Sequence, residues 1–376
     1  MSRRLLCILL TAAFAGTALA ATAATPAHAA KGMEVAVQDD PSFVSEISLK
    51  RKKALQLAQK LHVTRIRVNI PWVAVVNNAR SKKKPKHPKY DFTSYDRLWL
   101  AAHKRGIRLQ LTITGAAPAW ATGPHQVGNV LVDVGKFKGY VHAVINHFHG
   151  KVDRFAIWNE PNWRSWNSPL KGNAERYRNM YVAAYKIIKA RDKNAKVLIG
   201  ETSPYGESGR STAPVKFLRE VVKKGPLKAD GYAHHPYDYV HNPDWPSKHD
   251  DNASISGLRN LTDELDKLAR QKKLTTPKGK PLNLFLTEYG FMASGKYKKS
   301  DDKRAKYLPR AFTIALKNPR VRMMTQYFLA PPPPWSDFFD MSIVKSNGKP
   351  TKPFWALADW AKKQAKARMI ALPFPH

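Results

Sequence analysis

The sequence has little cysteine and few acidic residues. Its only cysteine is Cys7, so the chain cannot form an internal disulfide or a cysteine-based metal site. The 28 Asp and Glu residues are far outnumbered by 64 Lys and Arg, which gives a net charge of +36. Hydrophobic residues make up 43% of the chain, and this content excludes a disordered protein.

The excess of positive charge predicts attraction to something anionic. Nucleic acid, an acidic polysaccharide and a charged cell-wall polymer all fit it, and so does a surface that is simply rich in solvated lysine. The sequence has no recognisable nucleic-acid-binding module, so we expect no nucleic acid partner. An anionic glycan or cell-wall polymer stays open as the partner.

The first thirty residues have the layout of a secretory signal peptide. A pair of arginines, Arg3 and Arg4, precedes the apolar run 5–20, and Ala27-His28-Ala29 is a small-x-small cleavage site. The run is short, and no second apolar run of spanning length follows. We therefore predict a secreted protein without a membrane span, composed of a signal peptide over 1–30 and one domain over 31–376. Loss of the two arginines leaves a charge of +34.

Short apolar runs alternate with longer amphipathic stretches from residue 31 onward. The runs are rich in Val, Ile, Leu and aromatic residues, as expected of buried parallel strands. Strands are predicted at 33–38, 63–70, 107–114, 152–158, 195–200, 229–235, 282–288 and 322–329, and helices at 48–61, 94–106, 134–148, 173–192, 253–271, 303–318 and 353–367. This alternation predicts a (β/α)8 TIM barrel. A doubly wound open sheet is the alternative, but no glycine-rich nucleotide-binding motif supports it.

Two glutamates occupy equivalent places in this barrel. Glu160 follows the fourth strand in FAIWNEPNW, where Pro161 helps to end the strand, and Glu288 closes the seventh strand in LNLFLTE. Functional side chains of such barrels lie at the C-terminal ends of the strands, so we expect both carboxylates to face one cavity. A facing pair suits cleavage of a glycosidic bond, with one proton donor and one nucleophile. A capped turn or a salt-bridged strand end is the alternative for either glutamate alone.

With this pair, the sequence resembles the retaining glycoside hydrolases of clan A, and among them families 5 and 39. The Asn-Glu-Pro step at 159–161 matches the clan's acid/base position, and Glu288 in LFLTEYG matches its nucleophile. The resemblance implies cleavage of β-glycosidic bonds in an oligo- or polysaccharide by double displacement, without a metal or other cofactor. An apolar wall and the charge of Glu288 would raise the pKa of Glu160, and Asn159 would donate to a sugar 2-OH.

Three further residues match supporting positions of the clan. Arg67 in IRVNIPW matches an arginine that often ends strand two, and His235 and Tyr237 match a His-x-Tyr motif after strand six. Arg67 and Tyr237 would stabilise the charge of Glu288. His235 would orient Glu160 or bind a hydroxyl, or it would be only a hydrogen-bonded residue of the rim.

Aromatic side chains fall in the predicted strand-to-helix loops, on the same face as the two glutamates. Flat rings suit the C–H faces of sugars, although packing within a loop explains any one of them equally well. The candidate platforms are Trp120, Trp163 and Trp335, with Trp72, Trp166 and Trp245 in the same class of loop. At the end of strand five, Glu201 is expected either to contact a sugar hydroxyl or to form a salt bridge.

Two polar regions border the predicted site. Segment 234–250 holds several His and Asp residues but no tight ligand spacing, so a polar loop is predicted there and no metal site; within it, His234 has the strand parity of the helix side. The lysine-rich segments 81–89 and 294–304 are expected to border the cleft and to favour an anionic glycan. A catalytically silent carbohydrate-binding barrel and a basic polyanion-binding protein are the alternatives to an enzyme.

Overall fold

The computed structural model describes residues 32–374, and the predicted signal peptide at 1–30 lies outside this range. Eight strands close into a barrel in the order β1-β2-β3-β4-β5-β7-β9-β10, and each pairs in parallel with its neighbours. The (β/α)8 barrel predicted from the sequence is therefore confirmed. The strands are β1 (Glu34–Gln38), β2 (Arg65–Pro71), β3 (Arg108–Thr114), β4 (Arg154–Ile157), β5 (Lys196–Thr202), β7 (Gly231–His234), β9 (Leu284–Leu286) and β10 (Val321–Tyr327).

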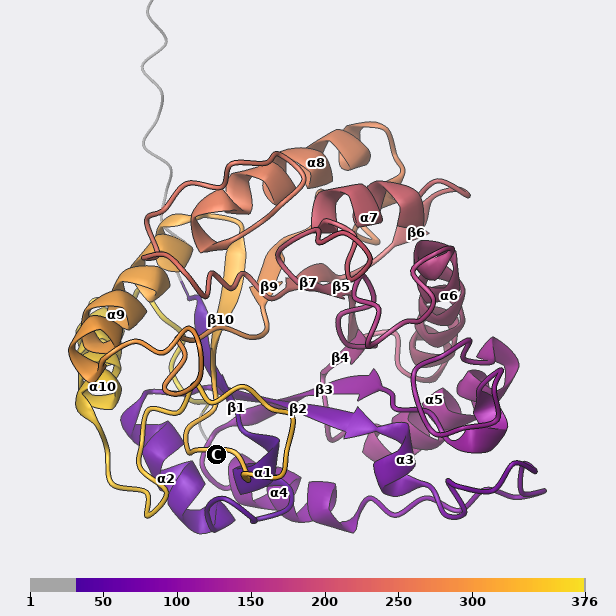
Figure 1. Ribbon diagram of the computed structural model, residues 1–376, viewed down its shortest axis with the longest axis horizontal. Helices are drawn as coiled ribbons and strands as arrows, with labels where there is room; N and C mark the ends of the chain where they lie inside the picture. Colours follow the sequence, from indigo (N-terminus) through magenta and orange to yellow (C-terminus); the bar gives the residue numbers. More distant parts are fainter. Residues whose placement is uncertain (1–31, 375–376) are drawn as a thin grey trace, which may run out of the picture.

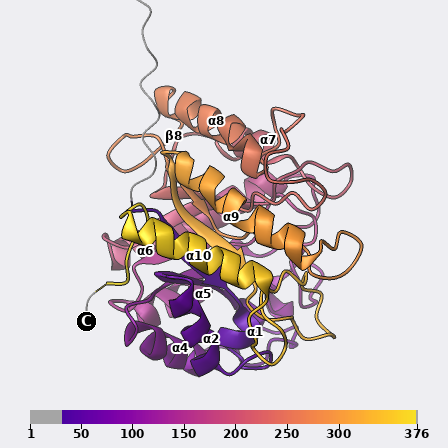
Figure 2. The same ribbon diagram turned by 90° about the vertical axis from the view of Figure 1, so that its left-hand side faces the viewer.

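Helices form a ring around these strands (Figure 1), and α9 and α10 lie side by side on one flank (Figure 2). The larger helices are α2 (Arg51–Lys60), α4 (Thr93–His103), α5 (Val134–Phe148), α6 (Asn173–Arg191), α7 (Pro214–Val221), α8 (Leu258–Arg270), α9 (Asp301–Lys317) and α10 (Lys352–Lys366). Helix α7 was not predicted from the sequence, because eight residues leave little room for a periodic pattern. No helix within residues 32–374 is long and apolar enough to cross a membrane.

Short elements occupy the connections. They are α1 (Asp40–Phe43), α3 (Trp72–Val75), the 3-10 turns Ala119–Ala121 and Ile255–Gly257, and a separate two-stranded pair of β6 (Leu227–Lys228) and β8 (Leu274–Thr275). Both α1 and α3 directly follow a barrel strand, so they lie at the end of the barrel where the two glutamates were predicted.

The barrel interior changes character along its axis. A small apolar layer crosses its middle and is formed by Ala36, Ala156, Leu198, Ala233, Phe285 and Met323. At the N-terminal end, Arg65 pairs with Glu34 at 2.9 Å and with Asp153 at 2.7 Å. Charged contacts at this end stabilise the barrel. Towards the C-terminal end the interior becomes polar again, beginning with Gln38, two residues after Ala36 on β1.

Candidate active site

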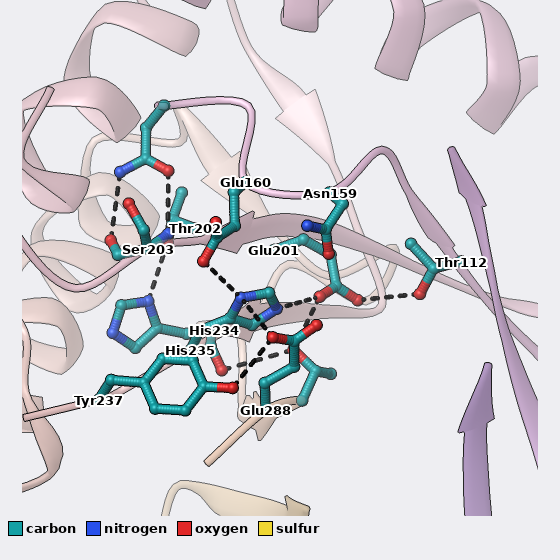
Figure 3. A network of polar contacts seen from close by, with 12 residues as sticks. Thr112, Asn159, Glu160, Glu201, Thr202, Ser203, His234, His235, Tyr237 and Glu288 are labelled. Atoms are coloured by element: carbon teal, nitrogen blue, oxygen red, sulfur yellow. Dashed lines mark hydrogen bonds and ion pairs between the residues drawn. The ribbon is translucent and has the colours of Figure 1, made fainter. Parts of the chain in front are cut away.

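Two buried glutamates meet at the C-terminal end of the barrel (Figure 3). Glu160 lies just beyond β4 and Glu288 just beyond β9. A carboxylate oxygen of each lies within 4.8 Å of the other, and His235 Nδ1 lies within the same distance of both. This separation is close to the ~5–5.5 Å of retaining glycosidases and well below the ~6.5–9.5 Å of inverting ones.

The backbone at Glu160 is bent to aim the side chain inward. Its φ is +37°, a region that non-glycine residues adopt infrequently, and its N–H donates to the carbonyl of Glu201 at 2.8 Å. Burial raises the pKa of Glu160, and the negative charge of Glu288 acts in the same direction, while a hydrogen bond with His235 opposes them. This glutamate is therefore the one of the pair that is prepared to hold a proton.

Two donors contact the carboxylate of Glu288. Arg67 Nη1 lies 2.5 Å from its Oε1, and the hydroxyl of Tyr237 donates to its Oε2 at 3.1 Å. The other end of the guanidinium donates to Asn159 Oδ1 at 2.9 Å and to Glu201 Oε2 at 3.0 Å. Arg67 is completely buried, so these charge-assisted contacts fix the positions of the Glu201 and Glu288 carboxylates.

An irregularity in β5 turns Glu201 into the barrel. The pairing of β5 with β7 shifts register between Gly200 and Thr202. Gly200 has a φ of +112°, and a Cβ atom added to it would lie only 2.5 Å from the carbonyl oxygen of Ala233. Regular alternation from the inward-facing Leu198 would direct Glu201 towards the helices. A bulge inserts one extra residue and reverses this alternation.

Two roles were predicted for Glu201, a sugar contact and a salt bridge. The structure shows the salt bridge, with Arg67. Glu201 is fully buried and lines neither cavity at the barrel mouth. Its Oε2 accepts from Arg67, from Thr287 Oγ1 at 2.8 Å, and from His235 Nε2 at 2.8 Å. Despite the opposing effect of burial, the positive charge of Arg67 lowers the pKa of Glu201.

His235 is the hub that connects the three carboxylates (Figure 3). Its Nδ1 lies 3.0 Å from Glu160 Oε1 and 3.5 Å from Glu288 Oε2, and its Nε2 faces Glu201. Burial alone would lower the pKa of His235, but these carboxylates, Glu288 foremost, raise it to about 9. The ring is therefore an imidazolium at neutral pH and donates through both nitrogens.

The preceding histidine faces the other way, as its strand parity predicted. His234 Nδ1 lies 2.9 Å from Thr202 Oγ1, and its Nε2 lies 2.6 Å from the carbonyl of Ala253, outside the barrel. Burial lowers the pKa of His234 to about 4, so this ring is neutral and structural.

Above the two glutamates lies a cavity of about 610 Å³, which we call the central cavity. Its wall is formed by Asn69, Asn129, Asn159, Glu160, Trp163, Ser165, Trp166, Tyr237, Tyr239, Glu288, Tyr327, Ser336, Asp337, Phe338 and Phe339. Sequence reasoning missed Asn69 and Tyr327, although both lie at strand ends. It also missed Tyr239, Phe338 and Phe339, which long loops bring over the site.

A second cavity of about 660 Å³, the side cavity, adjoins the central one. Trp163, Tyr239 and Phe339 line both of them. The side cavity extends over the loops after β5 and β7 and includes Trp245, whose ring stacks on His241 with centroids 4.4 Å apart. Together the two cavities provide room for more than one sugar ring.

The predicted aromatic platforms divide into three groups. Trp163, Trp166 and Trp245 line a cavity. Trp120 does not line a cavity, because it is buried and packs edge-on against the equally buried Trp72, with ring centroids 5.2 Å apart. The prediction that Trp120 is a substrate platform is wrong. Trp335 is 77% exposed and lines neither cavity, so its predicted place at the site is also not observed.

Positive charge lines the side cavity, through Arg210 and Lys248, but not the central one. The wall of the central cavity carries Glu160, Glu288 and Asp337 but neither Lys nor Arg. No residue of 81–89 lines either cavity, and from 294–304 only Tyr297 does. The high positive charge of the chain is therefore located mainly outside the cleft.

The site contains possible metal ligands, but positively charged side chains already occupy positions next to them. Glu160, His235 and Glu288 form the one group of three possible ligands that residues 32–374 bring together. The guanidinium of Arg67 already contacts Glu288, and the imidazolium of His235 repels a metal ion. In segment 234–250, Asp238 binds His241 and Asp244 pairs with Arg310.

Comparison with known proteins agrees with this geometry. The sequence profile of the family "Cellulase (glycosyl hydrolase family 5)" matches residues 25–318, which is most of the chain. The chain belongs to glycosyl hydrolase family 5. The predicted resemblance to clan A is thereby confirmed, and none of the curated proteins matches the chain in sequence.

Solved structures similar to this family 5 chain share its fold. A family 39 glycoside hydrolase from Bacteroides cellulosilyticus WH2 has 19% identity and a TM-score of 0.65, with 88% of this chain and 64% of that chain covered. A family 39 β-xylosidase from Caulobacter crescentus has 17% identity and a TM-score of 0.59, with 89% and 72% covered. Xylanase 10B from Thermotoga petrophila RKU-1 has 16% identity and a TM-score of 0.58, with 89% and 95% covered. The chain thus spans less than two thirds of the Bacteroides enzyme.

Proposed function

We propose that this protein is a secreted retaining glycosidase that cleaves β-glycosidic bonds of an oligo- or polysaccharide. The observation that carries the proposal is the pair of carboxylates, Glu160 and Glu288, within 4.8 Å of each other at the mouth of a family 5 barrel. Such a close approach matches retaining glycosidases, in which the second carboxylate is the nucleophile, and not inverting ones, in which the wider gap holds an attacking water molecule.

Glu160 is the acid and later the base. In the first step it gives its proton to the glycosidic oxygen as the bond to the leaving sugar breaks. Burial favours its protonated form before this step, and the imidazolium of His235 at 3.0 Å stabilises the carboxylate that results. In the second step the same carboxylate takes a proton from a water molecule. The water oxygen bonds to the anomeric carbon as the bond from that carbon to Glu288 breaks, and the sugar is released.

Glu288 is the nucleophile. Its Oε2 accepts from Tyr237, and its Oε1 from Arg67, so both oxygens are oriented before substrate binds. The carboxylate attacks the anomeric carbon and forms a covalent glycosyl-enzyme. Asn159 lines the same cavity and uses its Oδ1 to accept from Arg67, which leaves its Nδ2 to donate to the 2-OH of the sugar.

Among the contacting residues Arg67, His235, Glu160, Glu201 and Glu288, the charges balance only when Glu160 is protonated. Arg67 and His235 contribute two positive charges, and ionised Glu201 and Glu288 contribute two negative ones. Ionised Glu160 would add a third negative charge to this largely buried group. The cluster therefore favours a single protonated carboxyl, as general acid catalysis requires.

The sugar next to the glutamates is neutral in this proposal. Three acidic residues and no basic residue line the central cavity, so a uronate there would meet like charge. The family is named for cellulases, and the neighbours include a β-xylosidase and a xylanase solved with xylobiose. Neutral β-linked glucans and xylans are therefore the first substrates to test.

A panel of glucan and xylan oligosaccharides tests the proposal. Wild type and Glu288→Gln are incubated with each glycan, and the products are separated by size. Hydrolysis by wild type and loss of at least about 10⁴-fold in the variant are expected. If no glycan is cleaved while both proteins bind one equally well, the barrel is a silent carbohydrate-binding protein. Secretion is tested separately by fusing residues 1–30 to a reporter and measuring its export.

A further inference from the structure

A third cavity is lined by residues of helices α5 and α6, which are neighbours in the outer ring of helices (Figure 1). It has a volume of about 470 Å³ and shares no lining residue with the central or side cavity. We call it the α5–α6 groove. It is lined by Val134, Lys138, His142, Arg178, Asn179, Val182, Ala183, Lys186 and Ile187.

The groove is basic and has no acidic wall. Lys138 and His142 lie one turn apart on α5, and Arg178 and Lys186 lie two turns apart on α6, roughly 12 Å along the helix axis. Both lysines are exposed, and neither has an ion-pair partner among residues 32–374. Lys138 on α5 and Arg178 and Lys186 on α6 thus bring three positive charges to the lining of one groove.

Arg178 is fixed in place by its own chain. Its Nη1 donates to the carbonyls of Val221 at 2.8 Å and Gly225 at 3.0 Å. No described residue accepts from its Nη2 or Nε, so that side of the planar guanidinium remains available for a carboxylate. Because the side chain is already ordered, binding costs less conformational entropy than it would at a free arginine.

Aliphatic side chains form the apolar part of the groove. Val134 comes from α5, and Val182, Ala183 and Ile187 come from α6. Such a surface packs against the C–H faces of sugar rings. It contains no aromatic side chain on which the bases of a single-stranded nucleic acid would stack. Its concave form also does not suit a flat lipid bilayer.

We propose that the α5–α6 groove binds an acidic polysaccharide that bears carboxylates on successive sugars. The carboxylates pair with Lys138, Arg178 and Lys186, and the rings lie on the aliphatic floor. The groove is separate from Glu160 and Glu288, so it holds the protein on an anionic polymer without placing that polymer in the central cavity. The groove adds a specific contact to the long-range attraction from the net charge of +36.

Binding of the full-length chain to polygalacturonate tests this proposal. The double variant Lys138→Ala/Lys186→Ala is compared with the matched control Lys273→Ala/Lys280→Ala, which removes the same charge from exposed positions in the loops before β9. At physiological salt, we expect the groove variant to bind about 10-fold more weakly and the control to bind less than twofold more weakly. Methyl-esterified polygalacturonate, which lacks the charge, should not bind.

Three results would overturn the proposal. The first is equal weakening in both double variants, which would show that net charge alone is responsible. The second is the absence of saturable binding by wild type. The third is tighter binding of single-stranded DNA with the same dependence on Lys138 and Lys186. Hydrolysis of neutral glycans is measured on the same samples and should be unchanged, so the groove and the catalytic proposal succeed or fail independently.

Discussion

His235 Nδ1 lies 3.0 Å from Oε1 of Glu160, the side chain that must both lose and regain a proton. The ring is positively charged at neutral pH because its carboxylate neighbours raise its pKa to about 9. It therefore stabilises the ionised form of Glu160, whereas burial stabilises the protonated form. These opposed effects allow the proton to move in both directions during one catalytic cycle.

The charge of His235 predicts a loss of stability in mild alkali. The folded pKa is about 9 and the ordinary value is 6.5, so the stabilisation is complete below pH 6.5 and is lost as the pH rises through 9. Between these values we expect the free energy of unfolding in urea to fall by about 1–3 kcal/mol. In His235→Gln this fall should be much smaller; an identical fall in both proteins would show that the ring is not an imidazolium.

The role of Glu160 as acid predicts a dependence on the leaving group. Glu160→Gln should reduce kcat/KM for an oligosaccharide by about 10²–10⁴-fold. The loss should be far smaller for an aryl glycoside that releases an acidic phenol, because this leaving group needs no proton. Glu220→Gln, at an exposed position on α7, is the matched control and should behave as wild type. An equal loss with acidic and weakly acidic phenols would argue against proton donation by Glu160.

The buried contacts of Arg67 predict a loss of stability when its guanidinium is removed. Arg67→Met leaves Glu201 and Glu288 buried without their guanidinium partner, and we expect about 3–5 kcal/mol less stability in urea denaturation. Arg67→Lys keeps the charge but loses the fork, so it should be intermediate. As a control, Arg259→Met removes an exposed pair with Asp263 and should change stability by less than about 0.5 kcal/mol. Similar stability of the two methionine variants would contradict the account.

Substitution of Trp120, Trp163 and Trp335 should give three different phenotypes. Trp120→Ala should lower stability by about 3–5 kcal/mol, since it empties a buried site. Trp163→Ala should leave the fold nearly unchanged and raise KM about 3–10-fold, since the ring lines both cavities. Trp335→Ala should alter neither. Urea denaturation and steady-state kinetics separate these cases, and a raised KM with normal stability in Trp120→Ala would show that this ring contacts substrate.

The sequence was most informative where one local rule decides the position of a side chain. The apolar runs predict the strands of the barrel, and the strand-end rule places Glu160, Glu288 and His235 at one end without any knowledge of distances. Strand parity correctly separates His234 from His235. Each of these inferences depends on regular alternation within a few residues.

The sequence was least informative where long-range packing decides. Trp120 and Trp163 both follow a strand, and only the neighbouring Trp72 reveals that the first is buried. Glu201 faces inward because of the bulge at Gly200. The close approach of Gly200 to Ala233, which requires a glycine there, is seen only in the folded structure. The aromatic wall formed by Tyr239, Phe338 and Phe339 comes from loops whose path over the site no short pattern specifies.

The configuration of the first product tests the central claim most directly. Wild-type enzyme is added to a β-linked substrate that it cleaves, and the anomeric protons are followed by NMR from the first minutes, before mutarotation equilibrates them. If Glu160 and Glu288 act as acid and nucleophile at their observed separation, the β-anomer appears first. Initial release of the α-anomer would mean inversion, and Glu288 would then not be the nucleophile.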